Sequence, residues 1–212
     1  MLRTKALTTI ILLTISFSGL AQIFEGKVIY KMEIKNADPN LPDSIFRKMY
    51  AGGLELTQVY YYKNNMYKSE TEGLEVKSIQ IYDPATNRTY GYTDGADVAF
   101  WSEGSGTWRI EKLDLKEDIM GIPCKAVLIK SGVSQLTLYY GSKFKIDAKQ
   151  IKGDSFWEKY LRETGAIPLK YVIKGGPAKH YVVMTATEVK EEKLPDDIFK
   201  LPTSMKLMKS PF

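Results

Sequence analysis

Residues 24–35 read FEGKVIYKMEIK, and the alternation of side-chain types along them decides the fold class. Apolar residues occupy every second position, and lysine or glutamate occupies most of the others, with Ile29 as the exception. Successive side chains of a β-strand point to opposite faces, so the pattern predicts a long strand with one buried and one solvated face. A solvated face is typical of antiparallel sheets, because parallel sheets are covered on both sides.

The same alternation recurs along the chain between short turns. Segments 54–62 and 66–72 flank a turn at 63–65 that contains two asparagines, a residue type that tolerates positive φ. Other alternating segments flank short turns at 84–87, 104–106 and 175–177. Strands joined one after another by short turns predict an antiparallel meander of about nine to eleven strands.

Two segments have helical rather than strand periodicity, 41–53 and 155–165. Their apolar stripes consist of Ile45, Phe46, Met49 and Tyr50 in the first and Phe156, Trp157, Tyr160 and Leu161 in the second. Ser155 and Glu158 fit a capping box, and Gly165 fits a left-handed helix end.

A third, shorter helical turn is predicted at 195–199. The two aromatic stripes are too apolar to face water, so both helices should lie on the sheet. The sequence therefore predicts an α+β fold. Its sheet is strongly curved and antiparallel, a half-open β-barrel, with two or three short helices covering the concave face.

The N-terminal segment has the layout of a secretory signal peptide. Two basic residues precede an apolar stretch at 6–20, and Gly19 and Ala21 are the small residues of a cleavage site. A membrane anchor is the alternative, but a bilayer span needs about 20 strongly apolar residues. We therefore expect a signal peptide at 1–21 and one domain at 22–212. This domain is expected to be exported to the periplasm or beyond, without a stable membrane span.

The charge and the cysteine content argue against nucleic-acid binding, disulfide bonding within the chain and metal binding. The net charge is +5, and removal of two leader cations leaves 5 − 2 = +3, with lysines dispersed among acidic residues. Nucleic acid is not an expected partner, because no basic run is present. A single cysteine excludes an intramolecular disulfide, and one cysteine with one histidine is too few for a metal site. No cofactor is expected.

The chain offers few candidates for catalytic or covalent chemistry. Three roles are open to Cys124. It could be a nucleophile with His180 as its base, or it could form an intermolecular disulfide. The third role, a small buried residue at a strand start, is favoured. Cys124 lies too far from the N-terminal segment for lipid attachment. Gly153-Asp154-Ser155 resembles the start of a GDS-type ester hydrolase, but the Asp-x-x-His run of such enzymes is missing, and Ser155 is better explained as a helix cap.

Residues 118–130, DIMGIPCKAVLIK, match an I-x-G-x-x-C-K pattern at a strand start. The pattern resembles that of an uncharacterised secreted bacterial family grouped with the outer-membrane lipoprotein carrier (LolA-like) superfamily. Shorter matches to the same family occur at Phe24, Gly26, Ile29 and Tyr30, at Gly165, Pro168 and Leu169, and at Leu194, Pro195, Phe199, Leu201 and Pro202.

The resemblance implies a half-open barrel whose helices cover an apolar cavity, which in carriers of this superfamily takes acyl chains. No arginine of this chain lies in a motif that matches the functional arginine of the carrier. We therefore expect an exported, non-enzymatic binder of an acyl chain or similar apolar ligand. Expected cavity-lining residues are Phe46, Met49, Tyr60, Tyr62, Phe100, Trp101, Tyr139, Phe156, Trp157 and Tyr160. The alternative is an envelope scaffold or sensor with a filled core that binds a protein partner.

Overall fold

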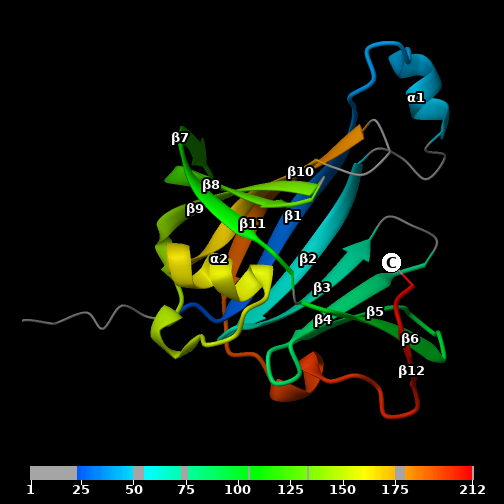
Figure 1. The fold of residues 1–212 in the computed structure, drawn as a ribbon, viewed down its shortest axis with the longest axis vertical. Coiled ribbons are helices and arrows are strands. Elements are labelled where there is room, and N and C mark those ends of the chain that lie inside the picture. Colours follow the sequence, from blue (N-terminus) through cyan, green and yellow to red (C-terminus); the bar gives the residue numbers. More distant parts are fainter. Residues whose placement is uncertain are drawn as a thin grey trace, which may run out of the picture.

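A computed structural model describes residues 23–49, 55–72, 76–104, 106–132, 134–174 and 180–211. They form one sheet of twelve strands (Figure 1). The strands are β1 Gly26–Asn36, β2 Glu55–Lys63, β3 Met66–Glu72, β4 Ser78–Asp83, β5 Arg88–Thr93, β6 Val98–Glu103, β7 Arg109–Ile119, β8 Ile122–Ser131, β9 Ser134–Lys145, β10 Ala166–Lys174, β11 His180–Glu191 and β12 Lys206–Lys209. The predicted signal peptide at 1–21 and the predicted turn at 175–177 lie outside the described residues.

The sheet consists of two antiparallel meanders that meet at β1 and β11. Its spatial order is β12-β6-β5-β4-β3-β2-β1-β11-β10-β9-β8-β7. A single continuous meander was therefore wrong at 104–106, because β6 and β7 lie in opposite halves of the sheet, β7 at one border and β6 next to β12 at the other. The chain crosses from one border to the other between these strands, and a local turn signal cannot reveal such a crossing. The twelfth strand, β12, pairs in parallel with β6 and is too short to show alternation in the sequence.

The predicted alternation places large side chains on the inner face of the curved sheet. Val28 and Tyr30 of β1 are completely buried, and the lysines of the strand, Lys27, Lys31 and Lys35, are partly or largely exposed. Gly26 is required by close packing in this strand, because a Cβ there would lie 2.1 Å from the carbonyl oxygen of Lys190. The first strand therefore packs against β11 more closely than side chains would allow.

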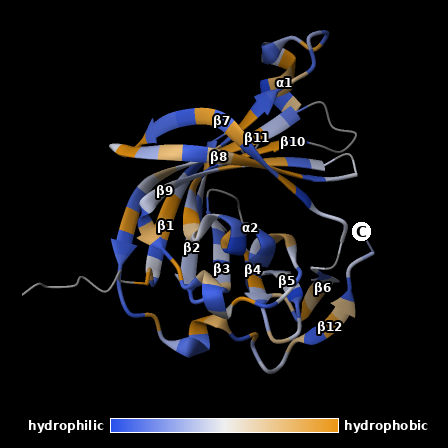
Figure 2. Cartoon of the chain, turned by 60° about the vertical axis from the view of Figure 1, so that its left-hand side comes forward, coloured by the Kyte–Doolittle hydropathy of each residue, from blue (hydrophilic) through white to orange (hydrophobic). Residues whose placement is uncertain are grey.

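Helix α2 (Phe156–Thr164) lies on the inner face, as predicted (Figures 1 and 2). Ser155 is its N-cap, and Gly165 ends it in the left-handed conformation with φ of 63°. The helical spacing buries Trp157, Tyr160 and Leu161 against the sheet. Of the described helices, none is both long and apolar enough to cross a membrane.

Helix α1 (Asp43–Met49) departs from the prediction. It lies beyond the ends of β1 and β2 rather than on the concave face (Figure 1). Phe46 is buried, but Met49 is 67% exposed. α1 belongs to the connection between two adjacent strands, β1 and β2, and extends outward from their ends. The remainder of the predicted helix, at 50–53, lies outside the described residues.

The C-terminal segment covers part of the outer face. The third predicted turn is a short 3-10 helix, η2 (Asp196–Phe199), and a second such helix, η1 (Ala148–Gln150), precedes α2. η2 contacts β3 and β4, with Phe199 buried beside Ile81, whose side chain points away from α2. The predicted helical cover is therefore divided, with α2 inside the curve and η2 outside it.

Glu25 holds the start of this C-terminal segment. Its Oε1 accepts a hydrogen bond from the Leu194 N–H at 2.7 Å and lies 3.4 Å from Lys63 Nζ. Lys63 also pairs with Asp196 at 2.6 Å and donates to the Leu194 carbonyl at 2.6 Å. Burial by itself would raise the pKa of Glu25, but the hydrogen bonds from Leu194 and Lys193 and the charge of Lys63 lower that pKa overall.

Because the pKa of Glu25 is lowered on folding, its stabilising effect is present above the unfolded-state pKa of 4.5 and is lost as pH falls through the folded-state pKa. We expect Glu25→Gln to lower the unfolding free energy by about 1 kcal/mol at pH 7. The difference from the parent should shrink toward zero in acid, as measured by urea unfolding from pH 7 to pH 3. The exposed Glu191, changed to Gln, is the control, and a pH-independent difference would contradict this role.

Candidate functional site

The inner face carries a cluster of aromatic side chains beneath α2, called here the inner cluster. It consists of Tyr30, Tyr60, Tyr62, Tyr67 and Tyr171 from the sheet and Trp157 and Tyr160 from α2. The Trp157 ring stacks on Tyr62 with ring centroids 5.6 Å apart, and it stacks on Tyr160 at the same distance. An edge of Tyr67 completes the packing around Trp157 at 5.4 Å. Side chains therefore fill the space directly beneath α2.

Hydroxyl groups of the inner cluster form one directed chain. Tyr30 donates to the Pro168 carbonyl at 2.6 Å, so it must accept from Tyr62, whose oxygen lies 3.2 Å away. Tyr62 in turn accepts from Tyr171 at 2.9 Å. Burial raises the pKa of all three hydroxyls, and they stay neutral. The buried hydroxyl of Tyr160 has no hydrogen-bond partner among the described residues.

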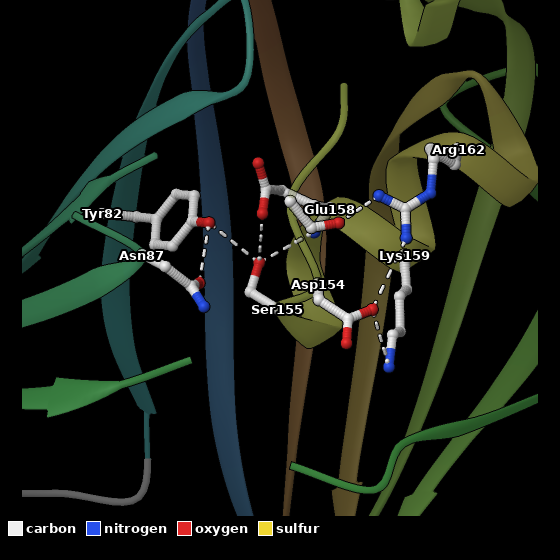
Figure 3. Close-up of polar contacts among 8 residues, drawn as sticks. Tyr82, Asn87, Asp154, Ser155, Glu158, Lys159 and Arg162 are labelled. Carbon is white, nitrogen blue, oxygen red and sulfur yellow. Dashed lines mark hydrogen bonds and ion pairs between the residues drawn. The ribbon is translucent and has the colours of Figure 1, made fainter. Parts of the chain in front are cut away.

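A buried polar group, called here the α2 clamp, holds the first turn of the helix (Figure 3). The Ser155 Oγ accepts the Glu158 N–H at 3.1 Å and lies 2.9 Å from the Tyr82 hydroxyl. Glu158 is 2% exposed and accepts hydrogen bonds from Ser155 and from Asn65 Nδ2, both at 3.2 Å. The clamp therefore joins α2 to β4 through Tyr82 and to the β2–β3 turn through Asn65.

The crossing segment between β6 and β7 passes beside the clamp. A Cβ at Gly104 would lie 2.5 Å from Asn87 Oδ1 and 2.7 Å from the Ser155 Cβ, so this position needs glycine. Asn87 itself accepts from the Tyr82 hydroxyl at 3.3 Å. Two chain turns and the crossing segment therefore converge on the N-terminus of α2.

The solvent side of α2 carries ion pairs. Lys159 lies 3.1 Å from Asp154, and Arg162 lies 3.9 Å from the same carboxylate while donating to the Gly153 carbonyl (Figure 3). Because Asp154 is largely exposed, these pairs contribute little to stability.

Strand β7 contacts α2 along another side. Lys112 pairs with Glu163 at 2.7 Å, and Trp108 packs on Phe156 with ring centroids 5.3 Å apart. α2 therefore lies between one border of the sheet and the turns of the opposite half.

The structure brings together four of the ten expected lining residues, Tyr60, Tyr62, Trp157 and Tyr160. Phe156 lies at their margin against Trp108. Other residues line hollows on the surface, for example one of about 560 Å³ between β10, β11 and β1 that includes His180.

The other five expected residues lie apart from the inner cluster. Phe46 and Met49 are on α1, and Phe100 and Trp101 are on β6 at a border of the sheet. Tyr139 alternates with the buried Leu138 and packs beside Lys170, whose Nζ lies 5.2 Å from its ring centre. These residues share aromatic or apolar character with the cluster but not its position.

Sequence reasoning missed three tyrosines of the cluster, Tyr30, Tyr67 and Tyr171. A signal was available for Tyr30, which shares the buried parity of Val28 in the opening strand. Tyr67 and Tyr171 are recognised as inward-facing only from their strand partners, which are Tyr62 and Met184. Such pairing cannot be read from a single sequence.

Cys124 is a buried packing residue, as favoured from the sequence. It is 2% exposed, and its sulfur donates weakly to the Ile122 carbonyl at 3.2 Å. His180 lies on β11, three strand positions from β8, so the two strands alone are about 14 Å apart across the sheet. A Cys124–His180 pair is therefore wrong, and Ser155 contacts Tyr82 and Glu158 rather than the single histidine.

Burial, with added effects from Asp118 and Glu117, raises the pKa of the Cys124 thiol to about 11. We expect iodoacetamide at pH 8 to modify the folded protein about 100-fold more slowly than the urea-unfolded chain, because the thiolate is the reacting form. Mass spectrometry of timed samples measures both rates. Equal rates would show that the thiol is accessible and reactive.

Loss of the Ser155 hydroxyl should destabilise the protein by about 1–2 kcal/mol, because it removes a helix cap and a contact with Tyr82. Tyr82→Phe should cost about 1 kcal/mol, and the double variant less than the sum, since both changes remove one shared hydrogen bond. Urea unfolding measures all three. The exposed Ser78, changed to Ala, should stay within about 0.5 kcal/mol of the parent. Additive losses would refute the shared contact.

Fold and site together define a half-open sheet protein, with a large curved, mostly antiparallel sheet and an α-helix over its inner face. No family model and no curated protein matches the sequence. Among solved structures, PNGF-II is 12% identical over 87% of this chain, with a TM-score of 0.50. The chain spans about a third of that protein's length (32%), so the likeness shows a shared fold.

Two further solved structures match most of both chains. An uncharacterized conserved protein from Thermus thermophilus is 11% identical over 88% of this chain and 91% of its own, with a TM-score of 0.45. A LolA superfamily protein from Nitrosomonas europaea is 11% identical over 85% and 93%, with a TM-score of 0.33.

Proposed function

We propose that this protein is an exported, non-enzymatic binder of an acyl chain or similar apolar ligand, held between α2 and the inner face. One observation carries the proposal. α2 is a nine-residue helix that covers an aromatic interior, and its first turn is attached through a polar clamp to the opposite half of an open sheet. A helix attached in this way can leave the sheet without breaking any strand pairing.

The free energy of burying an acyl chain can offset the free energy of releasing α2 from the sheet. Releasing the clamp costs a helix cap and a few hydrogen bonds, on the order of a few kcal/mol. Each buried methylene of an acyl chain returns about 0.8 kcal/mol. A chain of more than about six buried methylenes therefore offsets the clamp, provided that Trp157 and Tyr160 exchange their contacts with the sheet for contacts with the ligand.

The rim beside α2 supplies cations for a ligand headgroup. Lys112, Lys159 and Arg162 surround the solvent side of the helix, and each now pairs with an exposed carboxylate. An acidic headgroup would compete with those weak surface pairs. We propose Tyr60, Tyr62, Phe156, Trp157 and Tyr160 as the lining of the site.

Quenching by a stearic acid that is dibrominated in mid-chain tests the proposal, because bromine quenches only nearby indoles. The chain has three tryptophans, so Trp101→Phe with Trp108→Phe leaves Trp157 as the sole indole. We expect saturable quenching of Trp157 at one ligand per protein, reversed by unlabelled palmitate. A variant that retains only Trp101, at the border of the sheet, is the matched control and should stay bright.

Absence of quenching, together with a ligand-free mass in native mass spectrometry after incubation with palmitate, would overturn the acyl-chain proposal. That result would favour the alternative of a scaffold or sensor whose filled interior is purely structural and whose surface binds a protein partner.

A further inference from the structure

The two borders of the sheet differ in how they are protected against pairing. At the β7 border the register shifts between Leu113 and Lys116, and such a bulge interrupts a continuous edge. Lys112 pairs with Glu163 there, and Lys130 of the neighbouring strand pairs with Glu111 at 3.1 Å. These are the features by which natural sheets avoid adding another strand.

The β12 border has an open hydrogen-bonding edge. β12 pairs in parallel with β6, and the N–H groups of Lys206 and Ser210 point inward, to the Asp97 carbonyl at 2.9 Å and the Trp101 carbonyl at 2.7 Å. In a parallel ladder alternate residues bond to one neighbour. The N–H and C=O groups of Leu207 and Lys209 therefore point away from the sheet, where no described strand meets them.

Apolar side chains flank this open edge on both faces of the sheet. Leu207 is 51% exposed and lies opposite Ala99 in the register, on one face. Met208 is 52% exposed and lies opposite Phe100, itself 46% exposed, on the other. Figure 2 shows this border on the side of the sheet opposite β7. An added strand would cover part of this apolar surface on each face of the sheet.

The border strand β12 carries two cations, Lys206 and Lys209. Among the described residues, no carboxylate lies within 4 Å of Lys206, Lys209 or Arg88. Lys112 at the opposite border, by contrast, is paired with Glu163. Arg88 and Lys209 instead lie over the Trp101 ring, at 3.9 and 5.4 Å from its centre. Cations without carboxylate partners attract an acidic partner.

We propose that the β12 border binds an extended, acidic segment of a partner protein, which adds to the sheet as a further strand with alternating apolar and acidic side chains. This surface does not depend on a ligand under α2. A second copy of the chain fits less well, because antiparallel pairing of β12 with itself would gather Lys206 and Lys209 of both copies on one short ladder.

Binding of a fluorescein-labelled peptide, acetyl-Glu-Val-Glu-Val-Glu-Val-amide, to the folded protein tests the proposal by fluorescence anisotropy. We expect saturable binding that weakens with salt, is lost when alternate peptide amides are N-methylated, and is lost when lysine replaces glutamate. Hydrogen exchange should slow at the amides of Leu207 and Lys209 on binding.

Two variants separate backbone from side-chain contributions. Leu207→Pro removes an outward N–H and leaves the inward bonds of β12 intact, and it should weaken binding at least tenfold. Leu207→Ala, the matched control, should weaken it only about threefold. A double variant, Lys206→Glu with Lys209→Glu, should also lose at least tenfold, and Trp101 fluorescence reports that β12 remains in place.

Equal affinity of the Leu207→Pro and parent proteins, or no binding by the parent, would overturn the proposal. A concentration-dependent dimer that Leu207→Pro abolishes would also overturn it, and would assign the border to a second copy of the chain. Acyl-chain quenching at Trp157 is measured separately, so failure of either proposal is distinguishable from failure of the other.

Discussion

The stacking of Trp157 on Tyr62 is the contact that holds the two halves of the sheet around one interior. α2 follows β9 in the chain and so belongs to the second meander, whereas Tyr62 lies on β2 of the first. The indole N–H also donates to the Asn65 carbonyl at 3.1 Å, at the end of the same strand pair. Together with the clamp contacts of Ser155 and Glu158, this stacking joins the two meanders across the interior, away from their pairing along β1 and β11.

The interior is aromatic, but its hydroxyls make it less uniform than a hydrocarbon pocket. Because Tyr171, Tyr62 and Tyr30 satisfy one another and end on the Pro168 carbonyl, they present ring faces rather than free hydroxyls to anything that enters. Tyr160 is the exception, with a buried hydroxyl that has no hydrogen-bond partner in the part of the chain that the structure describes. A ligand with one acceptor near the helix would therefore gain a hydrogen bond that a plain alkane would not.

Local features of the structure were readable from the sequence, and pairing between distant segments was not. The alternation at 24–35 and the cap residues Ser155 and Gly165 specify elements through neighbours in the chain, and the structure confirms them. The separation of β6 from β7 depends on which strands pair across the whole sheet.

The candidate site follows the same division. The stripe on α2 identified Trp157 and Tyr160, because helical spacing alone marks them as buried. Phe100 and Trp101 have equally apolar side chains, but their strand lies at a border, and composition does not report position within a sheet. Aromatic content therefore predicted that a cluster exists and only partly which residues form it.

The crossing segment sets a physical limit on how far the half-barrel can open. It joins β6, the strand next to β12, to β7 at the other border, and from Glu103 to Arg109 it has only 109 − 103 = 6 residue steps. Fully extended, six steps reach about 20 Å. The borders therefore cannot separate at that point by the roughly 30 Å width of a small folded domain. The interior at this point is therefore closed to a folded domain.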